Sequence, residues 1–151
     1  MRAVVQRAKQ GGVYISSLNY SAEIGRGLVI LVGIKIDDLV EDVVFVADKC
    51  INLRIFEDQD SKMNLSLKDI NGEVLIISQF TLYGDTSKGN RPSFTEAAKP
   101  DIAIPLYNKF LERIKGQVGI DKVKAGVFGE MMDVKIINDG PVTVIVESKS
   151  R

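Results

Sequence analysis

Residues 28 to 34 read LVILVGI, a run that holds no charged side chain and does not alternate between apolar and polar positions. A continuous apolar run of this length is typical of a strand that is covered on both faces. We therefore expect this strand at the centre of a sheet. A second run, VLIISQF at 74 to 80, predicts another buried strand, but its end turns polar.

Shorter strand-like segments lie at both ends of the chain. Two short β-branched runs separated by Gly11-Gly12 predict a hairpin within the first 15 residues. Near the C-terminus, apolar and polar residues alternate over 132–136 and 142–146, and Asn138-Asp139-Gly140-Pro141 separates the two stretches. This pattern predicts a second antiparallel hairpin or a near equivalent of one.

Two segments have the three- and four-residue spacing of apolar side chains that an amphipathic helix requires. The first begins near Asp38 and reaches Ile51, with Asp38 as the expected N-cap and Glu41 as its capping-box partner. The second lies around 102–114, where Pro105 fits only near the first turn. The order strands, helix, strand, helix, strands predicts an α+β (mixed α/β) fold, with the helices packed on a largely antiparallel or mixed sheet.

The length of 151 residues corresponds to one domain, which we place at 1–151 and which is long enough to bury a core. Residues 83–101 hold two glycines, two prolines and no regular period, which is typical of a functional or mobile loop. We find no signal peptide and no apolar run of 18 residues, so we expect a soluble, cytoplasmic protein with no membrane partner.

The composition restricts the chemistry that this chain can perform. It has no histidine and one cysteine, Cys50, which excludes a Ser-His-Asp or Cys-His relay and an intramolecular disulfide. A structural zinc site is not expected, because histidine, the commonest zinc ligand, is absent and there is only one cysteine, so any metal would have to be hard and bound by oxygen ligands. We predict no metal and no cofactor. Cys50 falls on the apolar stripe of the first helix, which favours a buried thiol. The 20 basic and 20 acidic residues cancel, so any RNA binding must come from a local patch.

The strongest local anomaly is Ser78-Gln79-Phe80-Thr81-Leu82, where a buried strand ends in hydrogen-bonding side chains. Ligands in sheet-based folds often bind at this end of a strand. Either these side chains serve a ligand, or they bond to neighbouring backbone as the strand leaves the core. Thr81 is a poor nucleophile unaided, since no histidine can take its proton.

Three further features each have a structural and a functional interpretation. Asn138-Asp139-Gly140-Pro141 reads first as a turn, but a Gly-Pro bond can also be cis. Lys88, Arg91 and Phe94 lie in a loop that is either a solvated surface or a site for phosphates and a base. Arg7 is a charge within an otherwise apolar first strand, where it faces either solvent or a partner.

Five ordered blocks across the chain resemble the D-aminoacyl-tRNA deacylase family. They are MRAVVQR at 1–7, NLRIFED at 52–58, MNLSL at 63–67, SQFTLYGDTSKGNRPSF at 78–94 and NDGPVT at 138–143. The segment FGEMM at 128–132 differs from the FGADM that is usual in the family, because Glu130 and Met131 stand at its third and fourth positions.

The resemblance implies an enzyme that hydrolyses the ester of D-aminoacyl-tRNA, a proofreading reaction that frees the tRNA and the D-amino acid. Glycyl-tRNA, including glycine mischarged on alanine tRNA, is a further substrate that it implies. It also implies a homodimer with each active site at the subunit interface, and no cofactor. L-aminoacyl-tRNA is rejected in this family.

The resemblance also assigns site residues. The catalytic motif that lines the pocket and holds the developing oxyanion matches Ser78, Gln79, Phe80 and Thr81. The substrate-binding positions match four others: Gly140 and Pro141 enter the partner's pocket and reject L-amino acids, Arg7 braces them, and Met132 lines the pocket. Lys88 and Arg91 match a weak tRNA contact.

Two mechanisms are open for such a site. Either Thr81 attacks the ester, or a water does so with help from the 2′-hydroxyl of the terminal adenosine. The absence of histidine favours the second, so we assign Thr81 and Gln79 to positioning and hydrogen bonding. The alternative to an enzyme is a non-catalytic module of the same fold that binds RNA or a small molecule.

Overall fold

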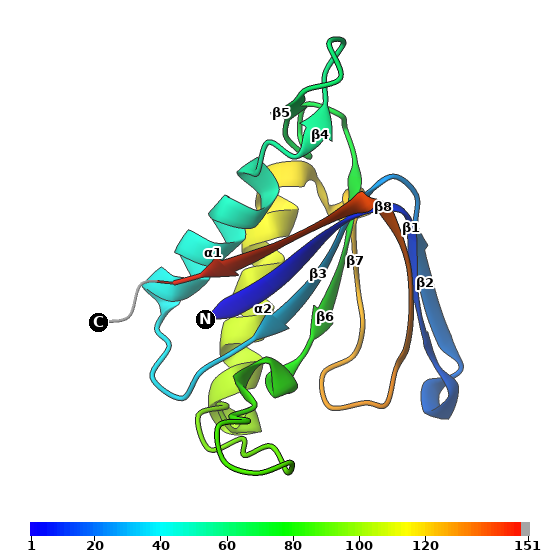
Figure 1. Ribbon diagram of the computed structural model, residues 1–151. Coiled ribbons are helices and arrows are strands. Elements are labelled where there is room, and N and C mark those ends of the chain that lie inside the picture. Colours follow the sequence, from blue (N-terminus) through cyan, green and yellow to red (C-terminus); the bar gives the residue numbers. More distant parts are fainter. Residues whose placement is uncertain (149–151) are drawn as a thin grey trace.

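The computed structural model describes residues 1–148 and has a six-stranded sheet at its centre (Figure 1). The strand order is β2-β1-β3-β6-β7, and β8 also pairs with β1. The strands are β1 (Arg2–Ile15), β2 (Tyr20–Ile24), β3 (Gly27–Gly33), β6 (Glu73–Ser78), β7 (Val123–Ala125) and β8 (Asp133–Glu147). The long helices α1 (Val40–Asn52) and α2 (Pro100–Val118) pack side by side on one face of this sheet (Figure 1). The predicted α+β fold is therefore confirmed.

The sheet is mixed, and β3 lies at its centre as predicted. β1 pairs antiparallel with β2, β3 and β8, whereas β3, β6 and β7 run parallel to one another. Successive residues of β3 point to opposite faces: Leu28 and Ile30 pack in the core beneath the helices, and Val29 packs with Leu75 in a second core on the other face. Cover on both faces explains the continuous apolar run at 28–34.

Neither predicted hairpin forms. Residues 2–15 make the one long strand β1, and residues 133–147 make the one long strand β8. These two strands pair with each other along most of their length, from Arg2 opposite Glu147 to Tyr14 opposite Asp133. Each predicted turn therefore lies inside a strand, and both strands bend over the second core (Figure 1).

Gly11 does not make a turn. It allows β1 to pass close to the side chain of Val29 in β3. A Cβ at this position would lie 2.7 Å from Cγ2 of Val29, which is too short for any real contact. The second half of β1 can therefore cross closely over β3 and pair with β2, beginning with Gly11 opposite Ile24. Glycine in a strand interior often marks such a bend.

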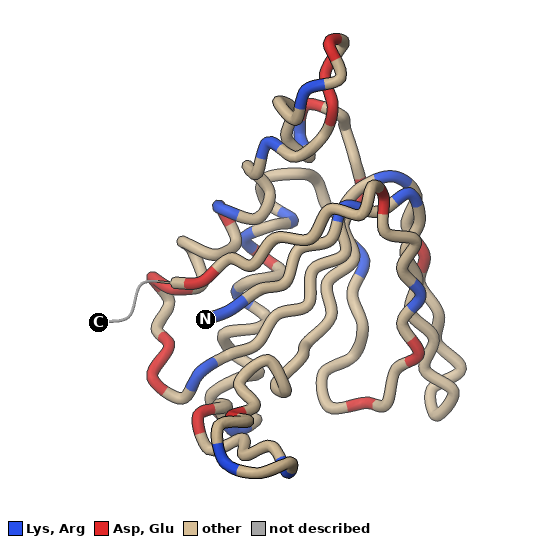
Figure 2. Tube along the Cα trace, in the orientation of Figure 1, with Lys and Arg blue, Asp and Glu red and all other residues tan. Residues whose placement is uncertain are grey.

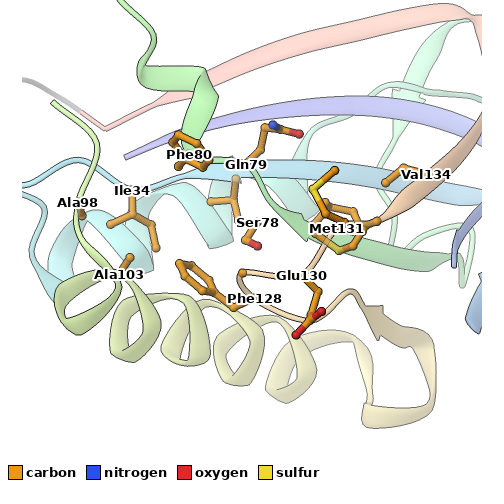
Figure 3. Close-up of a pocket in the computed structure, with 14 residues that line it drawn as sticks. Ile34, Ser78, Gln79, Phe80, Ala98, Ala103, Phe128, Glu130, Met131 and Val134 are labelled. Atoms are coloured by element: carbon orange, nitrogen blue, oxygen red, sulfur yellow. The ribbon is translucent and has the colours of Figure 1, made fainter. Parts of the chain in front are cut away.

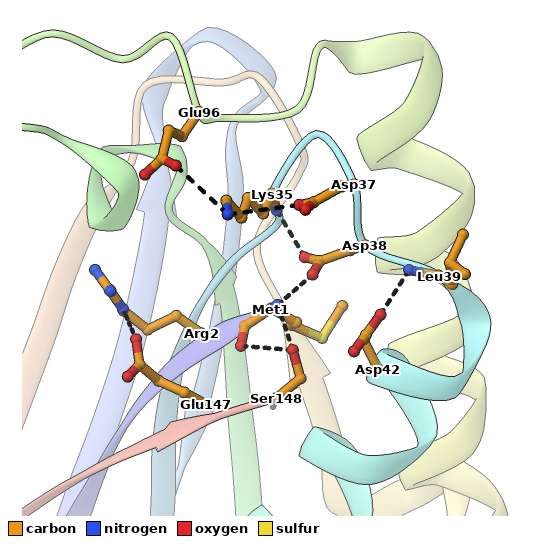
Figure 4. Close-up of polar contacts among 10 residues, drawn as sticks. All are labelled: Met1, Arg2, Lys35, Asp37, Asp38, Leu39, Asp42, Glu96, Glu147 and Ser148. Atoms are coloured by element: carbon orange, nitrogen blue, oxygen red, sulfur yellow. Dashed lines mark hydrogen bonds and ion pairs between the residues drawn. The ribbon is translucent and has the colours of Figure 1, made fainter. Parts of the chain in front are cut away.

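The N-terminus of α1 also differs from its prediction. The helix begins one residue later, after Leu39, and Oδ2 of Asp42 accepts a hydrogen bond from the Leu39 N–H at 2.8 Å. Asp38 is not the cap, because its carboxylate binds the buried N-terminal amine of Met1 and the backbone N–H of Lys35 (Figure 4). Asp38, the predicted N-cap, thus holds the N-terminal amine of Met1 next to the start of α1.

The remaining elements connect this framework. The polar stretch 57–72 holds a small hairpin of β4 (Phe56–Glu57) and β5 (Met63–Leu65), and the strand expected over 74–80 ends at Ser78. Pro105 lies in the second turn of α2 rather than the first, on an exposed part of the helix. Within residues 1–148, no helix is long and apolar enough to cross a membrane.

Candidate active site

A pocket of about 310 Å³ opens beyond the carboxyl ends of β3 and β6 (Figure 3). Its walls are mostly apolar. The lining residues are Val32, Ile34, Ile77, Ser78, Gln79, Phe80, Ala98, Ala103, Phe128, Gly129, Glu130, Met131, Met132 and Val134. Ligand sites in sheets with parallel strands commonly lie at this edge, so the fold itself positions a binding site here.

Ser78 presents a hydroxyl to this pocket. It is the last residue of β6, and its side chain points toward the space between Ile34 and Met131 in Figure 3. Its Oγ forms no hydrogen bond with any residue from 1 to 148, while the N–H of the next residue, Gln79, donates to the Val32 carbonyl at 2.8 Å. The parallel ladder therefore fixes the backbone at the point where the Ser78 hydroxyl faces the pocket.

Gln79 and Thr81 are joined to each other. Nε2 of Gln79 donates a hydrogen bond to Oγ1 of Thr81 at 2.5 Å. Thr81 belongs to the short 3-10 helix η2 (Phe80–Tyr83), is exposed, and does not line the pocket. The structure thus places Ser78, Gln79 and Phe80 in the pocket wall, but places Thr81 outside it.

Phe80 links the pocket to the long loop that follows. Its ring is 55% exposed and contacts the ring of Phe94 edge to face, with 5.2 Å between centroids. Backbone hydrogen bonds between Asp85 and Ser93 close the loop in between, at 2.7 and 2.9 Å. The 83–101 segment therefore docks against the pocket rim, although it contains no regular strand or long helix before α2.

Lys88 and Arg91 lie at the tip of this loop. Both are exposed, and neither forms an ion pair with another described residue. The N–H of Ser87 donates to the Asp85 carboxylate at 2.9 Å, and this bond holds the pKa of Asp85 below its usual range. Lys88 and Arg91 are therefore free to meet a phosphate, although Asp85 keeps a negative charge at the base of the loop.

The opposite wall comes from the segment between β7 and β8. The N–H of Gly126 donates to the Ile76 carbonyl at 3.0 Å, which turns the chain back toward the pocket. Phe128 contacts Tyr107 of α2, with 5.8 Å between ring centroids, and Met132 lines the pocket. Oε2 of Glu130 accepts a hydrogen bond from the Ser17 hydroxyl at 2.9 Å. Among residues 1–148, Glu130 is the only ionisable side chain in the lining.

Gly140 and Pro141 lie in a bulge of β8. On one side of the bulge Gln6 pairs with Thr143, and on the other side Ala8 pairs with Asn138. Arg7 alone therefore faces the four residues 139–142. The Gly140–Pro141 peptide is cis, and Gly140 has φ of 120°, in the region that favours glycine.

Arg7 supports this bulge from below. Its side chain is only 7% exposed; Nε donates to the Asp139 carbonyl at 3.2 Å and lies 3.3 Å from Asp139 Oδ2, and Nη1 donates to the Ile55 carbonyl at 2.7 Å. A Cβ on Gly140 would lie 2.9 Å from Nη2 of Arg7, so only glycine fits there. The buried guanidinium thus connects β1, the residue directly before β4, and the bulge.

One chain does not bring the bulge to its own pocket. Arg7 pairs with Leu28, and Leu28 with Val74, whereas the pocket begins at Val32 and Ser78. Four residues of strand separate these two levels, which corresponds to about 13 Å along the sheet. Gly140 and Pro141 are both exposed. The candidate site residues therefore form two groups at different places on the chain.

Charges are scattered over the rest of the surface. Lys, Arg, Asp and Glu occur side by side on the helices and loops, while the central strands are nearly uncharged (Figure 2). Cys50 is buried in the core, as predicted, and this burial raises the pKa of its thiol to about 12. No group of three or more Cys, Asp or Glu side chains in residues 1–148 is arranged to hold a metal ion.

The apolar walls of the pocket could not be found from the sequence. Ile34, Ala98, Ala103 and Val134 come from four separate segments, and each looks like an ordinary core residue in its local pattern. The anchors of the bulge, Ile55 among them, carry no local signal either, since a backbone carbonyl is present at every position. The residue pattern singled out the polar end of β6, the Gly140-Pro141 pair, Arg7 and the loop with Lys88 and Arg91, and the family resemblance added Met132.

Comparison with known proteins defines the class to which this fold and pocket belong. A family model described as D-Tyr-tRNA(Tyr) deacylase matches residues 4–147. A D-aminoacyl-tRNA deacylase from Geobacillus sp. (strain WCH70) is 56% identical over 100% of this chain and 97% of its own length. Another from Flavobacterium psychrophilum is 52% identical over 100% of this chain and 99% of its own length.

Two solved structures share this fold. A protein described as c-Myc DNA unwinding element binding protein is 39% identical and superposes with a TM-score of 0.93. The match covers 99% of this chain and 100% of that protein. A probable eukaryotic D-amino acid tRNA deacylase shares the fold, with a TM-score of 0.85 at 19% identity over 97% of this chain and 98% of its own. The chain belongs to the D-Tyr-tRNA(Tyr) deacylase family, which confirms the resemblance seen in its sequence.

Proposed function

We propose that this protein is a hydrolase that cleaves the ester between a D-amino acid, or glycine, and the 3′-terminal adenosine of tRNA. The observation that carries this proposal is the pocket at the carboxyl ends of β3 and β6, whose mostly apolar walls hold the hydroxyl of Ser78, which has no hydrogen-bond partner among residues 1–148. Such a pocket suits an amino-acid side chain and a nucleoside. Relatives more than 50% identical over the whole chain carry the name of this activity.

In the proposed reaction, water adds to the ester carbonyl and the bond to O3′ of the adenosine breaks. The products are the free amino acid and a tRNA whose O3′ regains a proton. Phe80 and Thr81 begin η2, where backbone N–H groups have no partner within the helix. These two amides can stabilise the oxyanion, while the neighbouring 2′-hydroxyl of the substrate assists the water.

Thr81 positions the substrate in this scheme rather than attacking it. Its Oγ1 accepts a hydrogen bond from Gln79, and no histidine exists that could take its proton. Ser78 binds the substrate through its hydroxyl, Phe80 provides a face on which the adenine can stack, and Met132 contacts the substrate within the pocket. Lys88 and Arg91 contact phosphates near the 3′ end.

The active enzyme is a homodimer in which Gly140 and Pro141 of one subunit complete the pocket of the other. Support comes from the distance between the bulge and its own pocket, and from the exposed apolar side chains of β8. Val134, Ile137 and Ile145 are 37%, 42% and 64% exposed, although they belong to a strand. Exposed apolar residues grouped along one element are typical of a protein interface.

Chirality is selected by crowding at the α-carbon. Gly140 and Pro141, held by Arg7, face the position that an L side chain would occupy, whereas a D side chain points to open space. Steric exclusion of this kind rejects L-amino acids as a class and accepts many different D-amino acids. The proposed protein therefore accepts D-amino acids of different sizes.

The experiment that tests this function compares D-Tyr-tRNA and L-Tyr-tRNA as substrates of the purified protein. We expect rapid release of D-tyrosine and little release of L-tyrosine. A non-catalytic module, the alternative that the comparisons do not favour, would bind the tRNA without turnover. Equal rates for the two esters, or no hydrolysis of either, would contradict the proposal.

We further propose that residues 1–151 act as one domain in the cytoplasm, where tRNA is charged. The family match over residues 4–147 supports a single domain, while residues 149–151 lie outside the described part.

A further inference from the structure

The bulge of β8 is closed at its neck by two side chains. Asn138 and Thr143 are the β8 residues that pair with β1 immediately before and after it, opposite Ala8 and Gln6. Nδ2 of Asn138 donates a hydrogen bond to Oγ1 of Thr143 at 3.0 Å. Nε2 of Gln6 lies 3.4 Å from the same Oγ1 and adds a weak contact from β1. The neck is thereby fastened both within β8 and to its neighbour.

Asn138 also holds the far side of the bulge. Its Oδ1 accepts a hydrogen bond from the backbone N–H of Val142 at 3.0 Å. Because that backbone group can only donate, it fixes which end of the amide is oxygen and turns Nδ2 toward Thr143. The half-buried side chain of Asn138 therefore accepts one hydrogen bond through its oxygen and donates another through its nitrogen, and the first bond fixes the direction of the second.

These bonds complement those of Arg7. Arg7 binds Asp139, the residue before Gly140, and Asn138 binds Val142, the residue after Pro141. Pro141 has no N–H of its own with which to join the ladder. The Gly140-Pro141 pair is thus anchored on both sides. The guanidinium of Arg7, from β1, holds the residue before it, and the side-chain amide of Asn138, from β8, holds the residue after it.

We propose that Asn138 is a positioning residue for chiral selection, and that it acts by fixing Val142 and the neck of the bulge so that Gly140 and Pro141 keep one position. This inference rests on the proposed function, in which these two residues reject L-aminoacyl esters. Steric rejection requires a rigid wall, since a wall that yields by about 1 Å admits the wrong substrate or loses the right geometry. Asn138 does not touch the substrate.

The experiment measures kcat/KM for D-Tyr-tRNA and L-Tyr-tRNA with three variants. Asn138→Ala removes both bonds, and we expect the D-over-L ratio to fall at least about tenfold, as the loss of two hydrogen bonds predicts. Asn138→Asp keeps an acceptor for the Val142 N–H and lets the Thr143 hydroxyl donate instead, so the ratio should return to within about threefold of wild type. Thr143→Val removes both contacts to the Thr143 hydroxyl at the neck but keeps the bond between Asn138 and Val142, so it should give an intermediate ratio.

Asn108→Ala, an exposed position on α2, serves as the control, and thermal unfolding is recorded for every variant. A fall in the ratio for Asn138→Ala, with recovery in Asn138→Asp, supports the proposal. A ratio unchanged in both Asn138→Ala and Thr143→Val, or a lower Tm with an unchanged ratio, overturns it. If Asn138→Ala fails to fold, the D-over-L ratio of Thr143→Val decides: a lower ratio supports the proposal and an unchanged ratio overturns it. A wild-type enzyme without any D preference overturns the proposed function as well, so the two failures are distinguishable.

Discussion

The side-chain amide of Gln79 donates a hydrogen bond to the hydroxyl of Thr81 at 2.5 Å, across the point where β6 ends and η2 begins. This contact engages one lone pair of the oxygen that would have to attack the ester if Thr81 were a nucleophile. Thr81 is also exposed and outside the pocket lining. Both observations count against Thr81 as the nucleophile and support the positioning role that we propose for it.

The first prediction concerns this assignment. Thr81→Val, which has nearly the same shape, should keep kcat/KM for D-Tyr-tRNA within about tenfold of wild type, because it removes one hydrogen bond. A substrate that ends in 2′-deoxyadenosine should react at least about 100-fold more slowly, the usual size of a lost acid-base contribution. The reverse pattern, with an acyl-enzyme burst from the wild type, would establish Thr81 as the nucleophile.

Arg7 should not tolerate replacement by lysine. Lysine cannot supply the planar fork that reaches Asp139 and Ile55 together. In Arg7→Lys we expect a loss of about 1–3 kcal/mol in the free energy of unfolding, because buried carbonyls lose a donor, and a fall of at least about tenfold in the D-over-L ratio. Urea unfolding and the two-substrate assay check this. Arg54→Lys, at an exposed position, should change neither quantity, and a wild-type ratio in Arg7→Lys would rule out the bracing role.

The proposed dimer predicts that a charge on β8 separates the subunits. Ile145→Asp places a carboxylate on a side chain that is 64% exposed in one chain, where a partner would cover it. We expect light scattering to show a monomer and deacylation to fall sharply, since each pocket then lacks its Gly140-Pro141 wall. Ile120→Asp is the control, at a position 70% exposed in η3 (Ile120–Lys122). A dimeric and fully active Ile145→Asp would contradict this interface.

Two glycines should respond oppositely to alanine. A Cβ on Gly27 would overlap the backbone carbonyl of Glu73 in the neighbouring strand, so Gly27→Ala should cost about 1–3 kcal/mol or abolish folding. A Cβ on Gly116 meets nothing within 4 Å, and this residue lies inside α2. Gly116→Ala should therefore stabilise the protein by about 0.5–1 kcal/mol. Denaturant titration measures both, and a stable Gly27→Ala would refute the tight contact between β3 and β6.

The ion pair between the helices predicts a dependence of stability on pH. Two nitrogens of the Arg113 guanidinium, Nε and Nη2, each lie 2.7 Å from a carboxylate oxygen of Asp48. These hydrogen bonds hold the pKa of Asp48 below its usual range. A carboxyl with a depressed pKa stabilises the fold above its ordinary pKa, and that stability is lost as the pH falls through the lower, folded value.

Arg113→Met should therefore lower the free energy of unfolding at pH 7 only slightly, because both side chains are partly exposed. The difference from wild type should shrink as the pH drops below about 4, the ordinary value for aspartate. Urea unfolding at a series of pH values measures it. A difference that stays constant with pH would show that Arg113 acts only through the packing of its apolar stem.

Much of the local structure was visible in the sequence. The continuous run at 28–34 identified the central strand, and the spacing over 39–51 and 102–114 identified both helices, because these patterns depend only on near neighbours in the chain. The polar end of β6 at Ser78 marked the edge at which the pocket lies. Cys50 was correctly placed in the core for the same reason, since it shares the apolar face of its helix.

Only the tertiary structure decided how the ends of the chain pair. Alternation over 132–146 is the same whether two short strands fold into a hairpin or one long strand pairs with β1, more than 100 residues away. Asp38 is an ideal cap by its position, yet the buried N-terminal amine competes for its carboxylate. Such competition depends on contacts between distant residues, which a local pattern does not contain.

The sequence by itself thus determined the family, the buried strands and the identity of the candidate residues. The structure decided that those residues form two groups, with Ser78 at the carboxyl end of β6 and Gly140-Pro141 in a bulge about 13 Å away along the strands. The physical reason is strand register. Arg7 lies opposite residues 139–142, and this register is set by the packing of β1 and β8 over two cores rather than by any pattern of neighbouring residues.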